Sequence, residues 1–253
     1  MNNKPIVKIL GERNSGTNYL HHLLRLNFSL DILPGVAPDF LRTEHERDHF
    51  FERSAGENLG WKHALAPDLQ LLHRSKGDPD RVVFLTITKN PYSWLWSLYR
   101  RPYHATQLYD NFDQFLQTPW KTVKRENAPT QFDNPVELWN KKNISYLELT
   151  KYATALNLRY EDFLVDFEHQ LRRISDFLGQ TTKQVPFQNQ INGTKRNGLP
   201  DFFSYRRYYL GEHWRHHLTN SQIALINNHL DPDLLQSFGY PEICTDSQVT
   251  AQM

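Results

Sequence analysis

The sequence predicts an α/β fold, a three-layer sandwich in which helices cover both faces of a central parallel sheet. Short β-type runs alternate with helical segments along the chain. The strongest of these runs, Arg81–Thr88, is apolar on both of its faces, as is typical of a central strand in a parallel sheet. A length of 253 residues suits one substantial domain.

The first strand and helix lie near the amino end. Ile6–Leu10 is a short β-type run that ends at Gly11. After the loop that follows, apolar residues recur at the spacing of a helix, at Leu20, Leu23, Leu24 and Phe28. This order predicts a strand, a tight loop and a helix.

The segment after this helix is less regular. Residues 31–57 contain Pro34, Gly35, Pro38 and the charged stretch Glu44–Arg53, which together predict a loop and a solvent-exposed helix. Asn58–His63 is a candidate for a second short strand. Pro67–His73 contains three leucines and predicts a short helix.

Strands and helices alternate again in the rest of the chain. Asn90-Pro91 and Asn134-Pro135 each predict a helix start, because a proline in the first turn lacks only an N–H group that would stay unpaired there. Leu156–Tyr160 predicts a further strand. Phe167–Leu178 predicts an amphipathic helix that stops at Gly179, and Thr219–Leu230 predicts a helix that begins with a capping box.

The composition excludes several classes of protein. Lys and Arg number 29 and Asp and Glu 28, for a net charge of +1, which argues against a nucleic-acid binder with a global basic field. The single Cys244 allows neither an intrachain disulfide nor a multi-cysteine metal site. The apolar run at the amino end is too short for a secretory signal, and no stretch reaches the length of a transmembrane helix. We therefore expect a soluble, cytoplasmic protein without an integral membrane segment.

The loop Gly11–Asn18 lies between the first strand and the first helix. Its backbone N–H groups and the helix dipole converge on one point, which suits a phosphate-like anion. Gly11 and Gly16 have the separation of the Walker A glycines, but Thr17 stands where that motif needs a lysine for the β/γ-phosphates. An ordinary ATP or GTP hydrolase is therefore disfavoured.

Segments spread along the chain together resemble a known family. They are Ser15-Gly16-Thr17 after the first strand, Lys89-Asn90-Pro91 followed by Ser97, and Arg159–Phe163 before an amphipathic helix. Their order and spacing are similar to those of the sulfotransferases that use PAPS (3′-phosphoadenosine 5′-phosphosulfate). The resemblance implies a P-loop NTPase-like sulfotransferase fold, PAPS as co-substrate, PAP as product, no metal, and sulfuryl transfer to a hydroxyl or amine.

The resemblance also implies which residues hold each end of PAPS. The 5′-phosphosulfate is expected at the first loop, on Arg13, Asn14, Ser15, Gly16, Thr17 and Asn18. By the same resemblance, Lys89 and Ser97 are expected to bracket the 3′-phosphate; eight helical residues rise by about 12 Å.

Four further residues are candidates for the nucleotide site. Tyr160 is a candidate for contact with adenine, although a core position suits this aromatic equally well, and Phe187 is a weaker candidate. Arg207, seven residues before Trp214, resembles a late basic motif of the family. Arg196 is a rival to Arg207 as a cation over the 3′-phosphate.

His63 is the candidate general base. It lies in a segment that resembles the Lys-His sequence of many sulfotransferases, and an imidazole that titrates near neutrality suits this role; the alternative is a histidine packed at a strand end. Many members carry a basic residue where this chain has Asn14. Arg13 or Lys62 is then expected to stabilise the leaving phosphate.

The departure at Asn14 keeps other functions open. One is a module that binds PAP or PAPS without turnover, and another is a P-loop-type kinase, which Thr17 opposes. His45 with His49, and His213 with His217, have the spacing of zinc ligands on a helix, but neither pair has the inner glutamate of a metalloprotease motif.

The expected domain spans residues 1–241, with 31–57 as an acceptor-side insertion and 242–253 as a tail. The expected partner is a small-molecule or glycan acceptor, and no nucleic acid. Many aromatic residues suit a carbohydrate, a phenol or a lipid-linked glycan alike, so the acceptor and the oligomeric state stay open.

Overall fold

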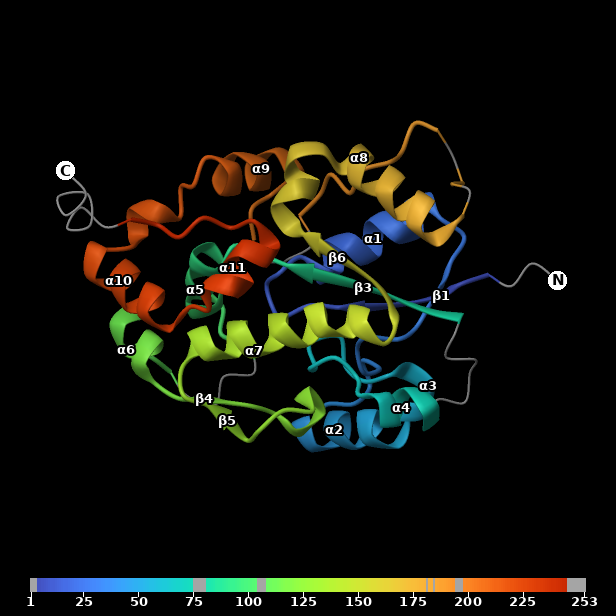
Figure 1. The fold of residues 1–253 in the computed structure, drawn as a ribbon, viewed down its shortest axis with the longest axis horizontal. Coiled ribbons are helices and arrows are strands. Elements are labelled where there is room, and N and C mark those ends of the chain that lie inside the picture. Colours follow the sequence, from blue (N-terminus) through green and yellow to red (C-terminus); the bar gives the residue numbers. More distant parts are fainter. Residues whose placement is uncertain are drawn as a thin grey trace.

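The computed structural model describes residues 4–74, 81–103, 108–180, 182–183, 185–193 and 198–244. Within this part of the chain, a central sheet of parallel strands in the order β2-β1-β3-β6 carries helices on both faces, which confirms the predicted α/β fold (Figure 1). The strands are β1 (Ile6–Leu10), β2 (Asp31–Ile32), β3 (Val82–Thr88) and β6 (Thr154–Arg159).

Alternate residues of the strands point to opposite layers. Val7 of β1 and Val83 of β3, which pair in register, pack with α1 (Thr17–Asn27) and α8 (Tyr160–Leu178). Phe84 packs on the other face with α4 (Leu69–Arg74) and α7 (Pro135–Glu148). Because β3 is buried along its whole length, it is the central strand that its two-sided apolar pattern predicts.

Several helix boundaries follow from side-chain caps. In α5 (Pro91–Arg100), the Asn90 side chain accepts hydrogen bonds from the first-turn N–H groups, and Asn134 does the same for α7. Thr219 and Gln222 form a capping box at α10 (Asn220–His229). Helix α8 ends at Gly179 in a left-handed conformation.

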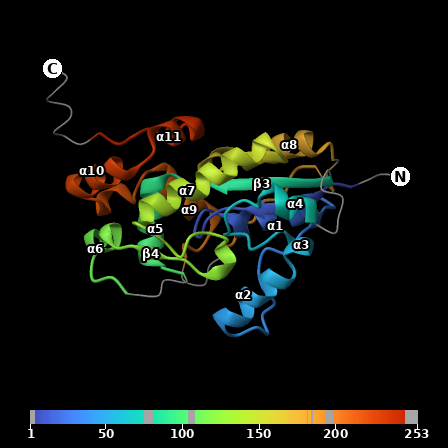
Figure 2. The same cartoon turned by 60° about the horizontal axis from the view of Figure 1, so that its bottom comes forward.

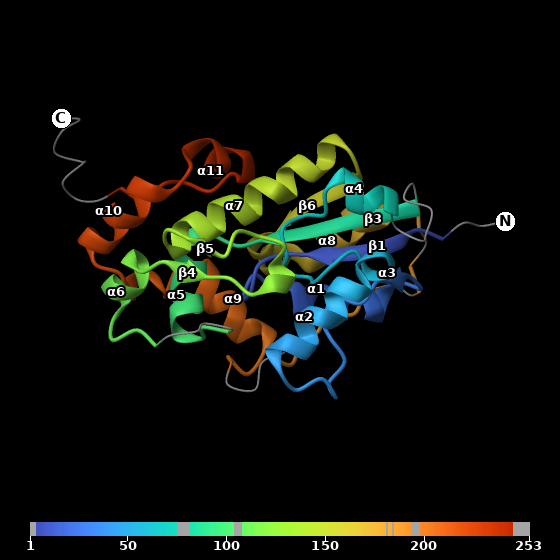
Figure 3. The same cartoon turned by 90° about the horizontal axis from the view of Figure 1, so that it is seen from below.

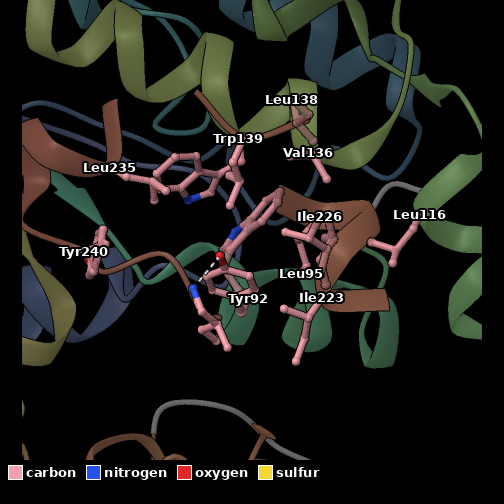
Figure 4. Close-up of a cluster of buried hydrophobic side chains, with 14 of the residues drawn as sticks. Tyr92, Leu95, Leu116, Val136, Leu138, Trp139, Ile223, Ile226, Leu235 and Tyr240 are labelled. Atoms are coloured by element: carbon pink, nitrogen blue, oxygen red, sulfur yellow. Dashed lines mark hydrogen bonds between the residues drawn. The ribbon is translucent and has the colours of Figure 1, made fainter. Parts of the chain in front are cut away.

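A second core lies beyond the carboxyl ends of the strands. There α5, α7 and α10 pack with α6 (Phe112–Gln117) and α11 (Pro232–Phe238) around large apolar side chains. Figure 4 shows members of this cluster, including Tyr92, Leu95, Trp139 and Ile226. A hairpin of β4 (Trp120–Lys121) and β5 (Gln131–Phe132) borders the cluster. This core supports α5, which follows the central strand directly.

Between β2 and β3 two predicted helices form, one of them α4 at the predicted Pro67–His73, and one predicted strand does not. Helix α2 (Glu44–Arg53) forms as predicted and projects from the body of the molecule (Figures 2 and 3). The strand predicted at Asn58–His63 does not form, because α3 (Ala55–Asn58) is followed by positive φ angles at Leu59 and Gly60. The short β2 pairs with β1 instead.

All four strands run towards the same edge of the sheet, which Figure 1 shows facing α5 and α9 (Phe202–Leu210). Gly11, Lys89 and Tyr160 directly follow β1, β3 and β6. The crevice at the carboxyl ends of parallel strands is where ligands bind in open α/β sheets. The fold therefore brings the sequence motifs to one edge. In the described part of the chain, no helix has both the length and the apolar character needed to cross a membrane.

Candidate active site

The loop after β1 has two residues in the left-handed region of backbone space. Asn14 has a φ of 63° and Gly16 a φ of 102°. Gly16 is the N-cap of α1, and no side chain caps this helix end, so the N–H groups of the first turn have no acceptor within the helix. These groups and the helix dipole give the loop, called the anion loop below, the geometry that suits an anion.

The side chains of the loop have different surroundings. The Ser15 hydroxyl is buried and donates to the Glu12 carbonyl at 2.6 Å, and Thr17 is buried in the first turn of α1. Asn18 is exposed, and its side-chain oxygen accepts a hydrogen bond from Lys62 Nζ at 2.5 Å. The structure thus brings Lys62 to the loop although it lies 44 residues away.

Arg13 points into the interior and not towards an open anion site. Its guanidinium donates to Glu12 at 2.7 Å and to Glu126 at 2.7 Å, and it lies over the Trp61 and Trp120 rings at 4.8 and 5.7 Å. Burial alone would lower the pKa of Arg13, but the two carboxylates raise it. The geometry assigns Arg13 to a buried ion-pair cluster and departs from the expected contact with PAPS.

His63 is tied to the first residue of the anion loop. Its Nδ1 lies 2.5 Å from the Gly11 carbonyl oxygen, and the Gly11 N–H donates to the Lys62 carbonyl at 2.9 Å. Because a carbonyl only accepts, Nδ1 carries the proton and Nε2 of the neutral ring is left as an acceptor. A Cβ on Gly11 would lie 2.5 Å from the Ile87 carbonyl oxygen, so only glycine allows this close approach.

The environment of this segment keeps His63 neutral. Burial lowers the pKa of His63 well below its usual value, and the charges of Lys62 and Arg13 lower it further. Burial also lowers the pKa of Lys62 to about 8. A neutral imidazole beside a lysine that is still largely protonated at neutral pH has the properties of a base next to a cation.

Lys89 and Ser97, which the sequence pairs across two helical turns, are in direct contact. Lys89 Nζ donates to Ser97 Oγ at 2.9 Å, and it lies 3.7 Å from the centre of the Tyr209 ring. The Tyr209 hydroxyl is 3.2 Å from Ser97 Oγ. Burial lowers the pKa of Lys89 to about 7, partly opposed by the charge of Glu161. Lys89 Nζ also lies 5.6 Å from the centre of the Tyr160 ring. A buried ammonium that contacts a hydroxyl and two aromatic rings is a favourable partner for an added anion.

Tyr160 packs against the anion loop. A Cβ on Gly16 would lie 2.5 Å from the Tyr160 ring, and the ring makes edge contacts with Tyr19 and Tyr209. These residues line one cavity, the inner cavity, together with Asn14, Lys89, Leu164, Gln190, Asn192, Gly193, Phe202 and Tyr205. Tyr160 is therefore both buried and part of the cavity wall, so the two alternatives for it are compatible.

The remaining predicted nucleotide residues lie elsewhere. Phe187 packs on Phe28 at the end of α1 and does not line the inner cavity. Arg207 is exposed on α9, away from the cavity that Tyr205 and Tyr209 line. Arg196 lies outside the described residues, as does Lys195.

Helix α9 supplies three cavity residues that are not among the predicted site residues. Phe202, Tyr205 and Tyr209 line the inner cavity, and their spacing of three and four residues is the signal of one helix face. Tyr209 also borders a second cavity, the arginine cavity, which is lined by Ser97, Arg100 and Arg101 among others. The tyrosine ring thus separates two cavities that meet at the Lys89–Ser97 pair.

The histidine pairs considered as zinc ligands lie outside this site. His45 and His49 stack on the exposed side of α2, and His217 stacks on Trp96. Within the described ranges, no three His, Cys, Asp or Glu side chains gather in a way that would hold a metal ion.

Several solved structures are similar to this chain over most of its length. The mouse sulfotransferase SULT7A1 complexed with PAP is 15% identical, with a TM-score of 0.51 over 90% of this chain and 84% of that one. The sulfotransferase domain of the Synechococcus PCC 7002 olefin synthase is 18% identical, with a TM-score of 0.47 and coverages of 94% and 95%. A sulfotransferase from Alicyclobacillus acidocaldarius is 16% identical, with a TM-score of 0.46 and coverages of 92% and 99%.

A search of curated proteins found no match. The profile of the sulfotransferase domain, however, matches residues 5–239. This span covers the anion loop, the Lys89–Ser97 pair, Tyr160 and α9, and it confirms the resemblance inferred from the motifs. The chain belongs to the sulfotransferase domain family.

Proposed function

We propose that this sulfotransferase moves a sulfuryl group from PAPS to a hydroxyl or amine of its acceptor, with His63 as general base. The observation that carries the proposal is the hydrogen bond between His63 Nδ1 and the Gly11 carbonyl. It leaves Nε2 as a proton acceptor next to the loop that would hold the phosphosulfate. PAPS, when bound, supplies the activated sulfuryl group.

The two anion sites of the chain would hold the two ends of the nucleotide. The first-turn N–H groups of α1 would bind the 5′-phosphosulfate, with Ser15, Thr17 and Asn18 on the same loop. Lys89 and Ser97 would bind the 3′-phosphate at the end of β3. Tyr160, between the two sites, supports an adenine position in the inner cavity.

In the transfer step, the acceptor oxygen forms a bond to sulfur while the bond between sulfur and the phosphate oxygen breaks. His63 Nε2 takes the acceptor proton, and PAP leaves. Lys62, held at the loop by Asn18, would neutralise charge on the leaving phosphate. The reaction needs no metal ion in this scheme, so we expect transfer to persist in excess chelator.

Binding without turnover is the second candidate, and one observation favours it. Arg13, the only cation within the loop, is engaged by Glu12 and Glu126, and Asn14 occupies the position that is basic in many members. Lys62 is then the one proposed source of leaving-group charge. Lys62→Met separates the candidates, because it should abolish transfer and leave PAP binding largely intact.

The test is a mass-spectrometric assay with PAPS and a panel of alcohols, amines and carbohydrates. We expect the wild type to add one sulfuryl group to a member of the panel and His63→Ala to lose about 10²–10⁴-fold in rate. His45→Ala, a histidine exposed on α2, is the matched control. PAP binding without a sulfated product would favour the module without turnover, and preference for Mg-ATP would favour the kinase.

A further inference from the structure

A buried charge cluster lies behind the proposed base, and the transfer step does not use it. It consists of Glu12, Arg13, Glu126 and Lys142, whose side chains are all at most 2% exposed. Lys142 Nζ lies 2.9 Å from Glu126 and 3.5 Å from Glu12. Two cations and two carboxylates make the cluster neutral, as a buried set of charges must be to persist.

Lys142 also contacts the segment that carries the base. Its Nζ donates a hydrogen bond to the His63 carbonyl oxygen at 2.5 Å. The ammonium group thus donates to the His63 backbone and forms ion pairs with Glu126 and with Glu12 of the anion loop. One side chain of α7 thus joins the loop to the base segment.

Neighbouring residues of α7 hold the rest of the segment. The Tyr146 hydroxyl donates to the Ala64 carbonyl at 3.0 Å, and Ser145 Oγ accepts from the Ala66 N–H at 3.1 Å. Lys142, Ser145 and Tyr146 are three and four residues apart, so they share one helix face. The Leu65 N–H donates to the Glu126 carbonyl at 2.9 Å. Every residue of 63–66 is therefore held from this side.

We infer that Lys142 and Tyr146 are positioning residues, which hold the His63 segment at a set distance from the anion loop so that the base and the sulfuryl donor are aligned. The inference rests on the proposed function, since it needs His63 as base. In-line transfer depends steeply on alignment, and a misplacement of about 1 Å can cost about 10²-fold in rate. Lys142 and Tyr146, together called the clamp, would meet this requirement because they fix the position of the His63 segment relative to the anion loop.

The charges around His63 determine in which direction its pKa changes when the Lys142 charge is removed. Lys62, Arg13 and Lys142 all act to keep the imidazole neutral, after burial, and the carboxylates of Glu12 and Glu126 lie beyond them. Removing the Lys142 charge leaves these carboxylates less compensated and favours the imidazolium. The pKa of His63 therefore rises, and the acidic limb of the pH profile of kcat moves to higher pH.

The experiment compares Lys142→Met with Lys141→Met, an exposed lysine one position earlier on α7. Lys142→Met is expected to lower kcat about 10- to 100-fold, to move the acidic limb upward, and to change PAP affinity much less than kcat. Lys141→Met should change none of these. Wild-type kcat and an unmoved acidic limb in folded Lys142→Met would overturn the inference.

A second variant covers the case in which Lys142→Met does not fold. Tyr146→Phe removes one hydroxyl and no charge, so it should lower kcat several-fold without moving the acidic limb or PAP affinity. Unchanged kcat in Tyr146→Phe would then overturn the clamp. If His63→Ala keeps full activity, the proposed base is wrong. If His63→Ala loses activity but Lys142→Met and Tyr146→Phe keep wild-type kcat, the base is supported and the positioning role is wrong.

Discussion

Two buried cations at the same edge of the sheet have opposite surroundings. Arg13 follows β1 and is met by the carboxylates of Glu12 and Glu126, each at 2.7 Å. Lys89 follows β3 and contacts the Ser97 hydroxyl and the Tyr209 ring, with no carboxylate within ion-pair distance among the described residues. The pKa of Arg13 is raised, although its burial alone would lower it, whereas burial lowers the pKa of Lys89 to about 7.

A buried cation whose charge is matched by carboxylates of the protein is expected to be structural, and one without such a match is a better candidate for binding an anion. Arg13 has its charge matched within the protein, so it adds little to an incoming anion and much to the architecture. In the described part of the chain, Lys89 has no carboxylate within ion-pair distance and, of the carboxylates, feels only the more distant charge of Glu161, so we expect a bound phosphate to be its main counter-charge.

Arg13→Met should have the largest effect on stability. Removing the guanidinium leaves Glu12 and Glu126 buried with only Lys142 to compensate them, and breaking a buried pair in this way costs about 3–5 kcal/mol in the free energy of unfolding. Urea denaturation measures this loss. Lys124→Met, which breaks the exposed pair with Glu52, is the control and should cost below about 1 kcal/mol.

If Arg13→Met were as stable as Lys124→Met, the buried charge cluster around Arg13 would not stabilise the loop. The proposed difference between Arg13 and Lys89 would then be wrong.

Gly16→Ala tests whether the loop depends on its contact with Tyr160. Both Gly16 and Gly60 have positive φ angles, 102° and 89°, so an alanine at either should cost about 1–2 kcal/mol in strain. Only at Gly16 does the added Cβ meet a neighbour, the Tyr160 ring at 2.5 Å, whereas at Gly60 nothing lies within 4 Å. Gly16→Ala should therefore cost about 1–3 kcal/mol more and weaken PAP binding. Equal losses in the two variants would show that the Tyr160 contact is easily relieved.

Lys89→Met should show the reverse pattern to Arg13→Met. Replacing a buried charge with an apolar side chain of similar length is often neutral or stabilising, so we expect a change in unfolding free energy within about 1 kcal/mol at pH 7. Denaturation of the free protein measures it. A loss as large as that of Arg13→Met would mean that the Lys89 charge is structural.

The pH dependence of PAP affinity gives the smallest and finest test. In the free protein the Lys89 ammonium loses its proton as the pH rises through about 7, and a bound phosphate favours the protonated form. Affinity should therefore fall from pH 7 to pH 9, by at most about tenfold per pH unit for each proton taken up. Lys89→Met should flatten the slope, and an unchanged slope would exclude Lys89 as the titrating group.

Local spacing made part of the site predictable. The motif placed Lys89 and Ser97 two helical turns apart on the helix that follows the central strand, and the long Lys89 side chain reaches Ser97 across this distance. The capped start of α5 at Asn90 fixes the register of that helix. The same reasoning predicted the parallel sheet, because its strongest strand carries the signal in its own residues.

Long-range contacts could not be predicted in this way. Arg13 pairs with Glu126, which is 113 residues away. Nothing in the loop sequence shows whether its arginine pairs with a carboxylate of the protein or contacts a phosphate. The strand expected at Asn58–His63 failed because positive φ at Leu59 and Gly60 turns the chain. The division into residues 1–241 and a tail, and the cytoplasmic location, stay predictions.

The most direct measurement is a calorimetric titration of PAP into the wild type and Lys89→Met, side by side at pH 7. The wild type should bind PAP, and Lys89→Met should lose about tenfold or more in affinity, since a hydrogen bond to a charged group contributes about 1.5–3 kcal/mol. Absence of binding by the wild type, or equal affinity in the variant, would contradict a nucleotide site built on Lys89 and Ser97.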